Sequence, residues 1–242
     1  NLSVLVGELV GARLIAHGVS RAISRVAPSY GSVSNPIGHA VALTLPGAGA
    51  YSGYEYAVHR VEQGGAAVEP AYDKPPTSPL VSGGPESLVP WDTLSREGRR
   101  FVNMVLTREE IETVMGEPAV ADPIRVFVGL DTAAEAEDRV DIIMDELVRT
   151  RAFERKVLCF ASPTGSGYIN YVAAESLEYM SLGDCAIVTM QYSMLPSSMS
   201  LTRTGLAIEQ NRDLMHAITG YLRGMEPEAR PRFVLFGESL GA

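Results

Sequence analysis

Apolar and polar residues alternate with strand-like and helix-like periods along the second half of the chain. Short runs rich in apolar and β-branched residues predict strands at residues 124–130, 157–161, 186–190 and 233–236. Longer segments with apolar positions three or four residues apart predict helices at 133–149, 171–180 and 206–222. Thr107 precedes Glu110 by three residues, the spacing of a capping box, which predicts another helix at 107–115. This alternation predicts an α/β protein with a parallel sheet covered by helices on both faces.

The first 27 residues show a different pattern. Apolar positions recur there with helical spacing, and the opposite face carries a basic stripe, which consists of Arg13, His17, Arg21 and Arg25. Two interpretations remain open: a helix that lies on an anionic membrane surface, or an ordinary helix with one solvated face. No stretch is a convincing membrane span, because charged residues or proline interrupt each candidate before about 18 apolar residues have passed.

Prolines mark a boundary between the two patterns. The stretch 66–90 is proline-rich and reads as an extended connector. We therefore divide the chain into a helical, membrane-associated segment (1–65), a connector (66–106) and an α/β core (107–242). Because the chain begins with Asn1 and ends within a motif, we expect the core to be the N-terminal half of a larger sheet.

Composition narrows the classes of function. The 242 residues are 46% hydrophobic, which is enough for one sizeable core. The net charge of −9 and the lack of a basic patch interleaved with aromatic residues argue against nucleic-acid binding. Cys159 and Cys185 lie in apolar runs and match no metal spacing, so we expect buried free thiols and neither a metal nor another cofactor.

The end of the chain carries the sharpest chemical signal. Gly237, Ser239 and Gly241 spell Gly-x-Ser-x-Gly directly after the last predicted strand. This pattern is typical of a nucleophile elbow, in which a serine on a tight strand-to-helix turn exposes its hydroxyl group. The small flanking residues let the strand and the helix approach each other closely. The alternative is a chance turn, because glycine and serine are common in loops.

A serine nucleophile also requires backbone N–H groups that stabilise the oxyanion. In proteins with a nucleophile elbow, one donor is the residue after the serine, here Leu240, and another lies in a loop after an earlier strand. Thr164 and Gly165 follow the second predicted strand and can supply it. Two alternatives remain for this loop: a phosphate-binding loop, although the Gly-Lys-Ser/Thr ending is missing, and a plain glycine turn.

The catalytic base is not evident in the sequence. In this type of site the chain order is serine, acid, histidine, whereas all four histidines precede Ser239. His216 shares a helix with apolar residues, which favours a structural role. We therefore expect the acid and the histidine beyond residue 242 and an inactive chain without them.

Two further features allow both a functional and a structural interpretation. Trp91 lies either at the mouth of the site or against the core, as an anchor of the connector. The segment 190–199, rich in methionine, forms either the wall of an acyl pocket or part of the core.

Several longer blocks resemble a bacterial family of membrane-associated α/β-hydrolases whose substrates are largely unassigned. Apart from the elbow, the blocks are 75–80, 82–94, 98–102, 126–130, 163–167, 190–193 and 195–197. The resemblance implies the N-terminal half of a hydrolase sheet, preceded by a multi-helix membrane region at the bacterial cell membrane. It also implies that Ser239 is the nucleophile.

The expected activity is that of a serine hydrolase. Its substrate would be a small molecule or lipid with an ester, thioester or related acyl bond. An acyltransferase that uses the same site, and a membrane scaffold or binding module without turnover, remain alternatives.

Overall fold

The computed structural model describes residues 69–195 and 204–241, together with Arg21, Arg25, Gly53, residues 55–60 and Gly64. The chain divides into two compact units, Asn1–Arg60 and Val61–Ala242. In the first unit, Arg21 and Arg25 are helical and exposed. The other two residues of the predicted basic stripe lie outside the described residues. No helix within the described part of the chain is long and apolar enough to cross a membrane.

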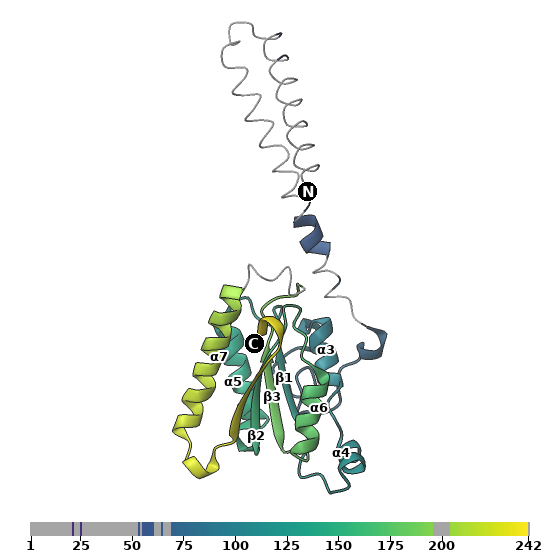
Figure 1. Ribbon diagram of the computed structural model, residues 1–242, viewed down its shortest axis with the longest axis vertical. Helices are drawn as coiled ribbons and strands as arrows, with labels where there is room; N and C mark the ends of the chain where they lie inside the picture. Colours follow the sequence, from purple (N-terminus) through teal and green to yellow (C-terminus); the bar gives the residue numbers. More distant parts are fainter. Residues whose placement is uncertain are drawn as a thin grey trace, which may run out of the picture. The chain divides into compact units, whose positions relative to one another are not determined.

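A parallel sheet forms the centre of the second unit (Figure 1). Its four strands are β1 (Ile124–Val128), β2 (Val157–Ser162), β3 (Cys185–Met190) and β4 (Arg232–Gly237), and their order across the sheet is β1-β3-β2-β4. The first three strands are almost entirely buried, as expected for apolar runs covered on both faces. The predicted α/β class and the parallel sheet are therefore confirmed.

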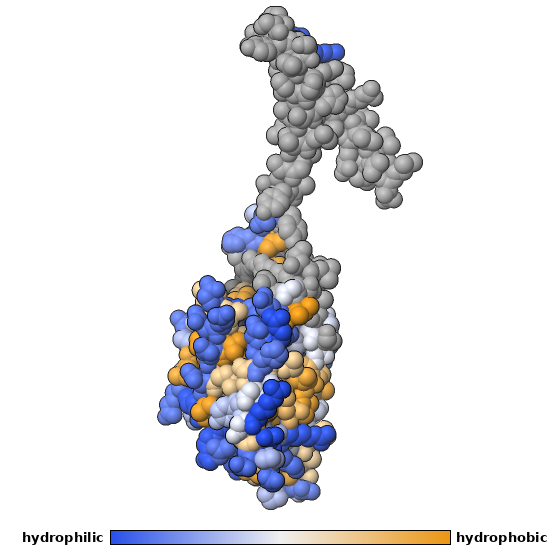
Figure 2. Space-filling view, turned by 90° about the vertical axis from the view of Figure 1, so that its left-hand side faces the viewer, coloured by the Kyte–Doolittle hydropathy of each residue, from blue (hydrophilic) through white to orange (hydrophobic). Residues whose placement is uncertain are grey.

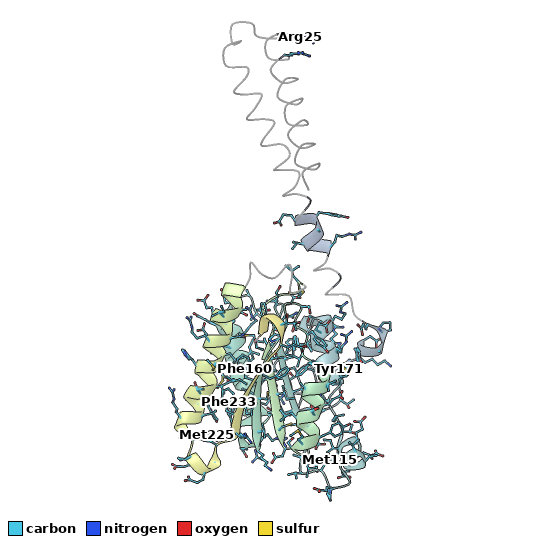
Figure 3. All side chains as sticks on the ribbon, in the orientation of Figure 1. Arg25, Met115, Phe160, Tyr171, Met225 and Phe233 are labelled. Atoms are coloured by element: carbon cyan, nitrogen blue, oxygen red, sulfur yellow. The ribbon has the colours of Figure 1, made fainter. Side chains whose placement is uncertain are left out.

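Helices cover both faces of this sheet. On one face, α5 (Ala136–Arg149) packs against α7 (Thr204–Gly224). The other face carries α3 (Arg96–Asn103) and α6 (Tyr171–Met180), and α4 (Arg108–Met115) packs against α6 (Figure 1). Side chains from the helices and the strands fill the space between the layers (Figure 3). Seen from the α5 and α7 side, hydrophilic residues cover much of the surface, and hydrophobic residues gather in smaller areas between them (Figure 2).

The predicted capping box at the start of α4 is present. The Thr107 hydroxyl oxygen accepts a hydrogen bond from the Glu110 N–H, and the Glu110 carboxylate accepts one from the Thr107 N–H. These two bonds satisfy N–H groups that have no partner within the helix. At the other end of α4, Gly116 adopts φ +68°, a left-handed conformation that terminates the helix.

The segment predicted as a connector packs against the sheet from Leu80 onwards, where the Leu80 carbonyl oxygen accepts a hydrogen bond from the Arg125 N–H. Val81 forms an isolated parallel bridge with Arg125 of β1, and the Ser82 hydroxyl oxygen accepts a hydrogen bond of 2.9 Å from the Phe127 N–H. The segment also contains α3, which the sequence did not predict because the helix has few apolar positions. Gly98 of α3 packs on the ring of Phe127, where a Cβ atom would lie 2.7 Å from a ring carbon. This part of the connector is thus a layer of the core.

Trp91 helps to hold this layer in place. It is half-buried against the hydrophobic core, and the Arg99 guanidinium lies 4.7 Å from the centre of its ring. Arg99 also donates a hydrogen bond of 3.0 Å to the Leu94 carbonyl oxygen. These contacts favour the anchoring interpretation of Trp91.

A buried ion pair joins the two layers on this side of the sheet. Arg125 of β1 and Glu178 of α6 are fully buried, with Nε–Oε1 and Nη2–Oε2 distances of 2.6 and 2.9 Å. Arg125 also donates to the Phe101 carbonyl oxygen of α3 (2.7 Å), and Glu178 accepts from the Leu106 N–H (3.1 Å). Burial raises the pKa of Glu178, and Arg125 opposes this shift. The pair therefore connects β1, α3, α6 and the loop after α3.

Candidate functional site

The candidate site lies at the carboxyl edge of the sheet. Because the strands are parallel, the segments that follow β2, β3 and β4 all leave the sheet at this edge (Figure 1). They are the loop 163–168, the segment 191–195 and the predicted elbow. Ligands bind at this edge in open α/β sheets.

Ser239 occupies a sharp turn directly after β4. It begins a single 3₁₀ turn, Ser239–Gly241, and its side chain is exposed. Its backbone has φ +59°, in the left-handed region that residues other than glycine rarely adopt. The Gly241 N–H donates a hydrogen bond of 3.0 Å to the Glu238 carbonyl oxygen, which closes the turn. A strained serine between a strand and a helical turn is the backbone geometry of a nucleophile elbow.

Gly241 brings this turn into direct contact with the loop after β2. A Cβ atom at Gly241 would lie 2.4 Å from the Ser162 carbonyl oxygen and 2.6 Å from that of Pro163. No side chain fits at these distances, which explains the glycine at this end of the motif. Gly237, at its other end, pairs with Ser162 in the β2–β4 register. The two segments in which the sequence predicts the nucleophile and an oxyanion donor are therefore neighbours.

The loop after β2 is a tight hairpin. The Thr164 N–H donates to the Tyr168 carbonyl oxygen (3.0 Å), and the Gly167 N–H donates to the Thr164 carbonyl oxygen (2.9 Å). Gly167 has φ +89°, as expected for the last residue of a three-residue hairpin loop.

The hydrogen bonds of this hairpin distinguish between the two predicted oxyanion donors, the N–H groups of Thr164 and Gly165. The Thr164 N–H is already used within the hairpin, whereas the N–H of the buried Gly165 donates to none of the residues that the structure describes. Gly165 is therefore the better candidate. The next helix, α6, begins only at Tyr171 with Asn170 as its N-cap, so the hairpin amides are not helix N-terminal amides of the kind that bind phosphate.

Two amide side chains that the sequence analysis missed hold the ends of this hairpin. Asn211 of α7 donates a hydrogen bond of 2.7 Å from Nδ2 to the Ser162 hydroxyl oxygen. Gln191, the first residue after β3, donates one of 3.0 Å from Nε2 to the Ser166 carbonyl oxygen. A single asparagine or glutamine belongs to no sequence motif, so the sequence does not mark it as functional. Its contact with the hairpin becomes visible only in the folded protein.

Comparison with known protein families agrees with this geometry. Residues 124–242 match the model of an alpha/beta-hydrolase family, and residues 2–104 match the model of the N-terminus of that family. The chain belongs to this α/β-hydrolase family. The N-terminal match includes α3, so this helix belongs to the family's N-terminal part although it packs on the hydrolase sheet. No curated protein and no solved structure gives a significant match.

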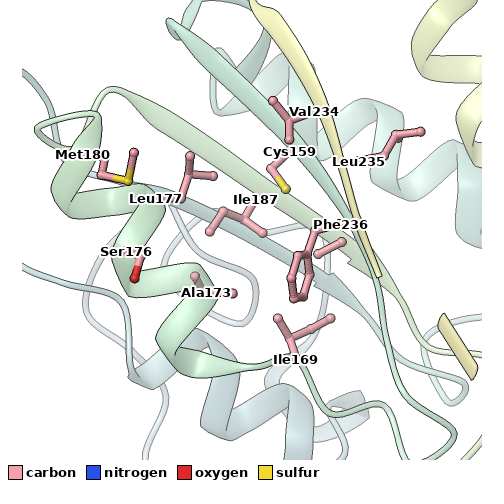
Figure 4. A pocket seen from close by; sticks show the side chains of 12 residues that line it. Cys159, Ile169, Ala173, Ser176, Leu177, Met180, Ile187, Val234, Leu235 and Phe236 are labelled. Atoms are coloured by element: carbon pink, nitrogen blue, oxygen red, sulfur yellow. The ribbon is translucent and has the colours of Figure 1, made fainter. Parts of the chain in front are cut away.

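Two of the hollows beside β4 lie near the predicted elbow. One has a volume of about 480 Å³ and lies between β4 and α7, where Met215, Leu235 and Gly241 form part of its lining. The other has a volume of about 230 Å³ and lies between α6 and the sheet, with an apolar lining that includes Leu177 and Phe236 (Figure 4).

The described part of the predicted acyl-pocket wall contributes to neither hollow. Met190, Tyr192 and Leu195 are buried instead, as the alternative of core packing predicted. The remainder of that wall, 196–199, lies outside the described residues.

The remaining candidates for chemistry lie elsewhere. His216 is exposed on α7 between the buried residues Leu214 and Ile218, and it lines neither hollow. Among the described residues, no group of histidine, cysteine and acidic side chains has the arrangement of a metal site. Cys159 and Cys185 are buried free thiols, as predicted, and burial raises their pKa values to about 11 and about 12.

Proposed function

We propose that this member of the α/β-hydrolase family is a serine hydrolase that acts on an ester, thioester or related acyl bond. The observation that carries the proposal is the backbone of Ser239, which has φ +59° in the turn after β4. This conformation costs a serine about 1–3 kcal/mol, which a glycine at the same position would largely avoid. The exposed Ser239 adopts this conformation despite its cost. This supports a role in which the hydroxyl group must point outward from the sheet edge.

In the proposed reaction the Ser239 hydroxyl oxygen attacks the acyl carbon, while a general base accepts the hydroxyl proton. Negative charge then develops on the carbonyl oxygen, and we assign its stabilisation to the N–H groups of Leu240 and Gly165. The leaving group departs with a proton from the protonated base. Water then hydrolyses the acyl-serine, which regenerates the hydroxyl group. The base and its acid partner belong after Ser239 in the chain order of this fold.

We further propose that the reaction takes place at a membrane surface. Arg21 and Arg25 are exposed on a helix and lie four residues apart, which supports contact with anionic headgroups. A membrane setting makes esters of lipids or of the cell envelope the preferred substrate class. Transfer of the acyl group to an acceptor other than water would use the same residues.

Labelling of the full-length protein with a fluorophosphonate tests the assignment. We expect covalent labelling that is lost in Ser239→Ala and retained in Ser176→Ala, a change of an exposed serine on α6. Labelling of separated membrane and soluble fractions tests the location in the same experiment, because label confined to the soluble fraction contradicts it. A wild-type protein that never labels would contradict the hydrolase proposal and favour a binding role on the same fold.

A further inference from the structure

Gln191 is a buried side chain between the sheet and the hairpin after β2. Its own N–H donates a hydrogen bond of 2.9 Å to the Val128 carbonyl oxygen, which fixes its backbone on β1. Its side-chain Nε2 donates one of 3.0 Å to the Ser166 carbonyl oxygen. The residue is fully buried, so this contact is shielded from water. Gln191 therefore links the carboxyl ends of β1 and β3 to the hairpin.

The contact fixes one peptide group at both of its ends. The Ser166 carbonyl and the Gly167 N–H belong to the same peptide group; the carbonyl accepts from Gln191, and the N–H donates to the Thr164 carbonyl oxygen (2.9 Å). A Cβ atom at Gly167 would lie only 2.4 Å from the Gln191 Nε2 atom. With this peptide group held, the turn cannot rotate without breaking a hydrogen bond. The direction of the Gly165 N–H, within the same turn, is thereby set.

The other end of the hairpin is held against the elbow. Asn211 binds the Ser162 hydroxyl oxygen (2.7 Å), and Gly241 lies against the Ser162 and Pro163 carbonyl groups. The hairpin is thus anchored at its start beside Ser239 and at its end by Gln191. A donor between these two anchors has little freedom to move relative to the nucleophile.

The second observation is a polar atom of Gln191 without a partner. Its Oε1 atom is buried and accepts no hydrogen bond from the residues that the structure describes. An unsatisfied buried acceptor costs about 1–3 kcal/mol, a cost that an apolar side chain of the same length would avoid. Packing alone therefore does not account for a glutamine here, whereas its hydrogen bond to the hairpin does.

We infer that Gln191 is a positioning residue that orients the Gly165 N–H toward the oxyanion formed at Ser239. The inference rests on the proposed serine hydrolase function. It assigns the donor in the hairpin to Gly165 and names the side chain that holds it in place.

The test is the reaction of Gln191→Met with a fluorophosphonate, compared with wild type. Methionine keeps the length of the side chain and removes the donor. Because a displacement of about 1 Å can cost about 100-fold in rate, we expect the maximal rate of covalent labelling to fall about 10- to 100-fold. The concentration for half-maximal rate should change less than about 2-fold, since ground-state binding is retained. The ³¹P NMR shift of the adduct should also change, because its phosphonyl oxygen loses the aligned donor.

Thr189→Val is the matched control. Thr189 lies on β3 two residues before Gln191, is fully buried, and its hydroxyl group has no hydrogen-bond partner in the described part of the chain. Its replacement should leave the labelling rate unchanged. Equal losses of rate in Gln191→Met and Thr189→Val would overturn the inference, because they would reflect general loosening of β3.

Gln191→Glu provides a second readout. An ionised carboxylate would face the Ser166 carbonyl oxygen without a proton to donate, whereas the protonated carboxyl group donates again. We expect the labelling rate of Gln191→Glu, divided by that of wild type at the same pH, to rise as the pH falls. A flat ratio would count against the hydrogen bond as the cause.

The outcomes for Gln191 and for the proposed function are distinguishable. A wild-type protein that labels at Ser239, together with an equally reactive and stable Gln191→Met, overturns the positioning role alone. A wild-type protein that does not label at Ser239 overturns both.

Discussion

The two edges of the sheet differ sharply in their cover. At the β1 edge, Val81 and Ser82 pair with the strand, and all five residues of β1 are buried. At the β4 edge, none of the described residues forms a further strand, and the Leu235 side chain is 58% exposed. Uncovered edges are where sheets accept additional chain. The comparison indicates that the core is stabilised around β1, while the candidate chemistry lies at the end of the open strand.

The largest loss of stability is expected from breaking the ion pair between Arg125 and Glu178, on the covered side of the sheet. Arg125→Met would leave the Glu178 carboxylate buried without its partner, which typically costs about 3–5 kcal/mol in the free energy of unfolding. Urea denaturation measures the loss. Arg108→Met is the control, because Arg108 pairs with Asp122 at 2.8 Å on the surface and should contribute less than about 1 kcal/mol. Equal losses in the two variants would contradict the assignment of the buried pair as a stabilising centre.

A matched pair of apolar truncations compares the two edge strands directly. Ile124→Ala on β1 removes a fully buried side chain, so we expect it to cost about 2–5 kcal/mol. Leu235→Ala on β4 removes a largely exposed one and should cost less than about 1 kcal/mol. Urea denaturation of both variants provides the measurement. A large loss for Leu235→Ala would mean that the β4 edge is covered in solution.

The smallest difference is expected between the alkylation rates of the two thiols, Cys159 and Cys185. Because burial raises the pKa of Cys159 to about 11 and that of Cys185 to about 12, little of either thiol is ionised at pH 8. Alkylation by iodoacetamide in the native protein should therefore be much slower than in urea, and it should accelerate as the pH rises. Cys159 lines the hollow beside β4, so it should react faster than Cys185. Mass spectrometry of the two peptides distinguishes them, and the reverse order would contradict the comparison.

The sequence predicts the regular elements of the core well, because apolar periodicity and strand length are local properties. It does not reveal α3, whose short sequence acquires its place through contacts such as that of Gly98 with Phe127. Arg125 escapes prediction for a related reason: its burial depends on Glu178, which lies 53 residues away in the chain. A charged residue is compatible with a buried strand only once such a partner is in place.

The candidate site, like the core, is only partly predictable from the sequence. The spacing of Gly237, Ser239 and Gly241 marks the elbow in the sequence, because the steric demands of the turn act on neighbouring residues. The choice between Thr164 and Gly165 depends on hydrogen bonds within the folded hairpin, and the sequence leaves it open. The membrane segment, the substrate and the catalytic base remain predictions.

The contact between the elbow and the hairpin has a consequence for evolution. Gly241 meets the carbonyl groups of Ser162 and Pro163, so backbone rather than side-chain atoms set the spacing of the two segments. Residues of the hairpin other than its glycines can therefore change without altering that spacing. The separation of the elbow and the hairpin can thus be inherited unchanged while neighbouring side chains diversify.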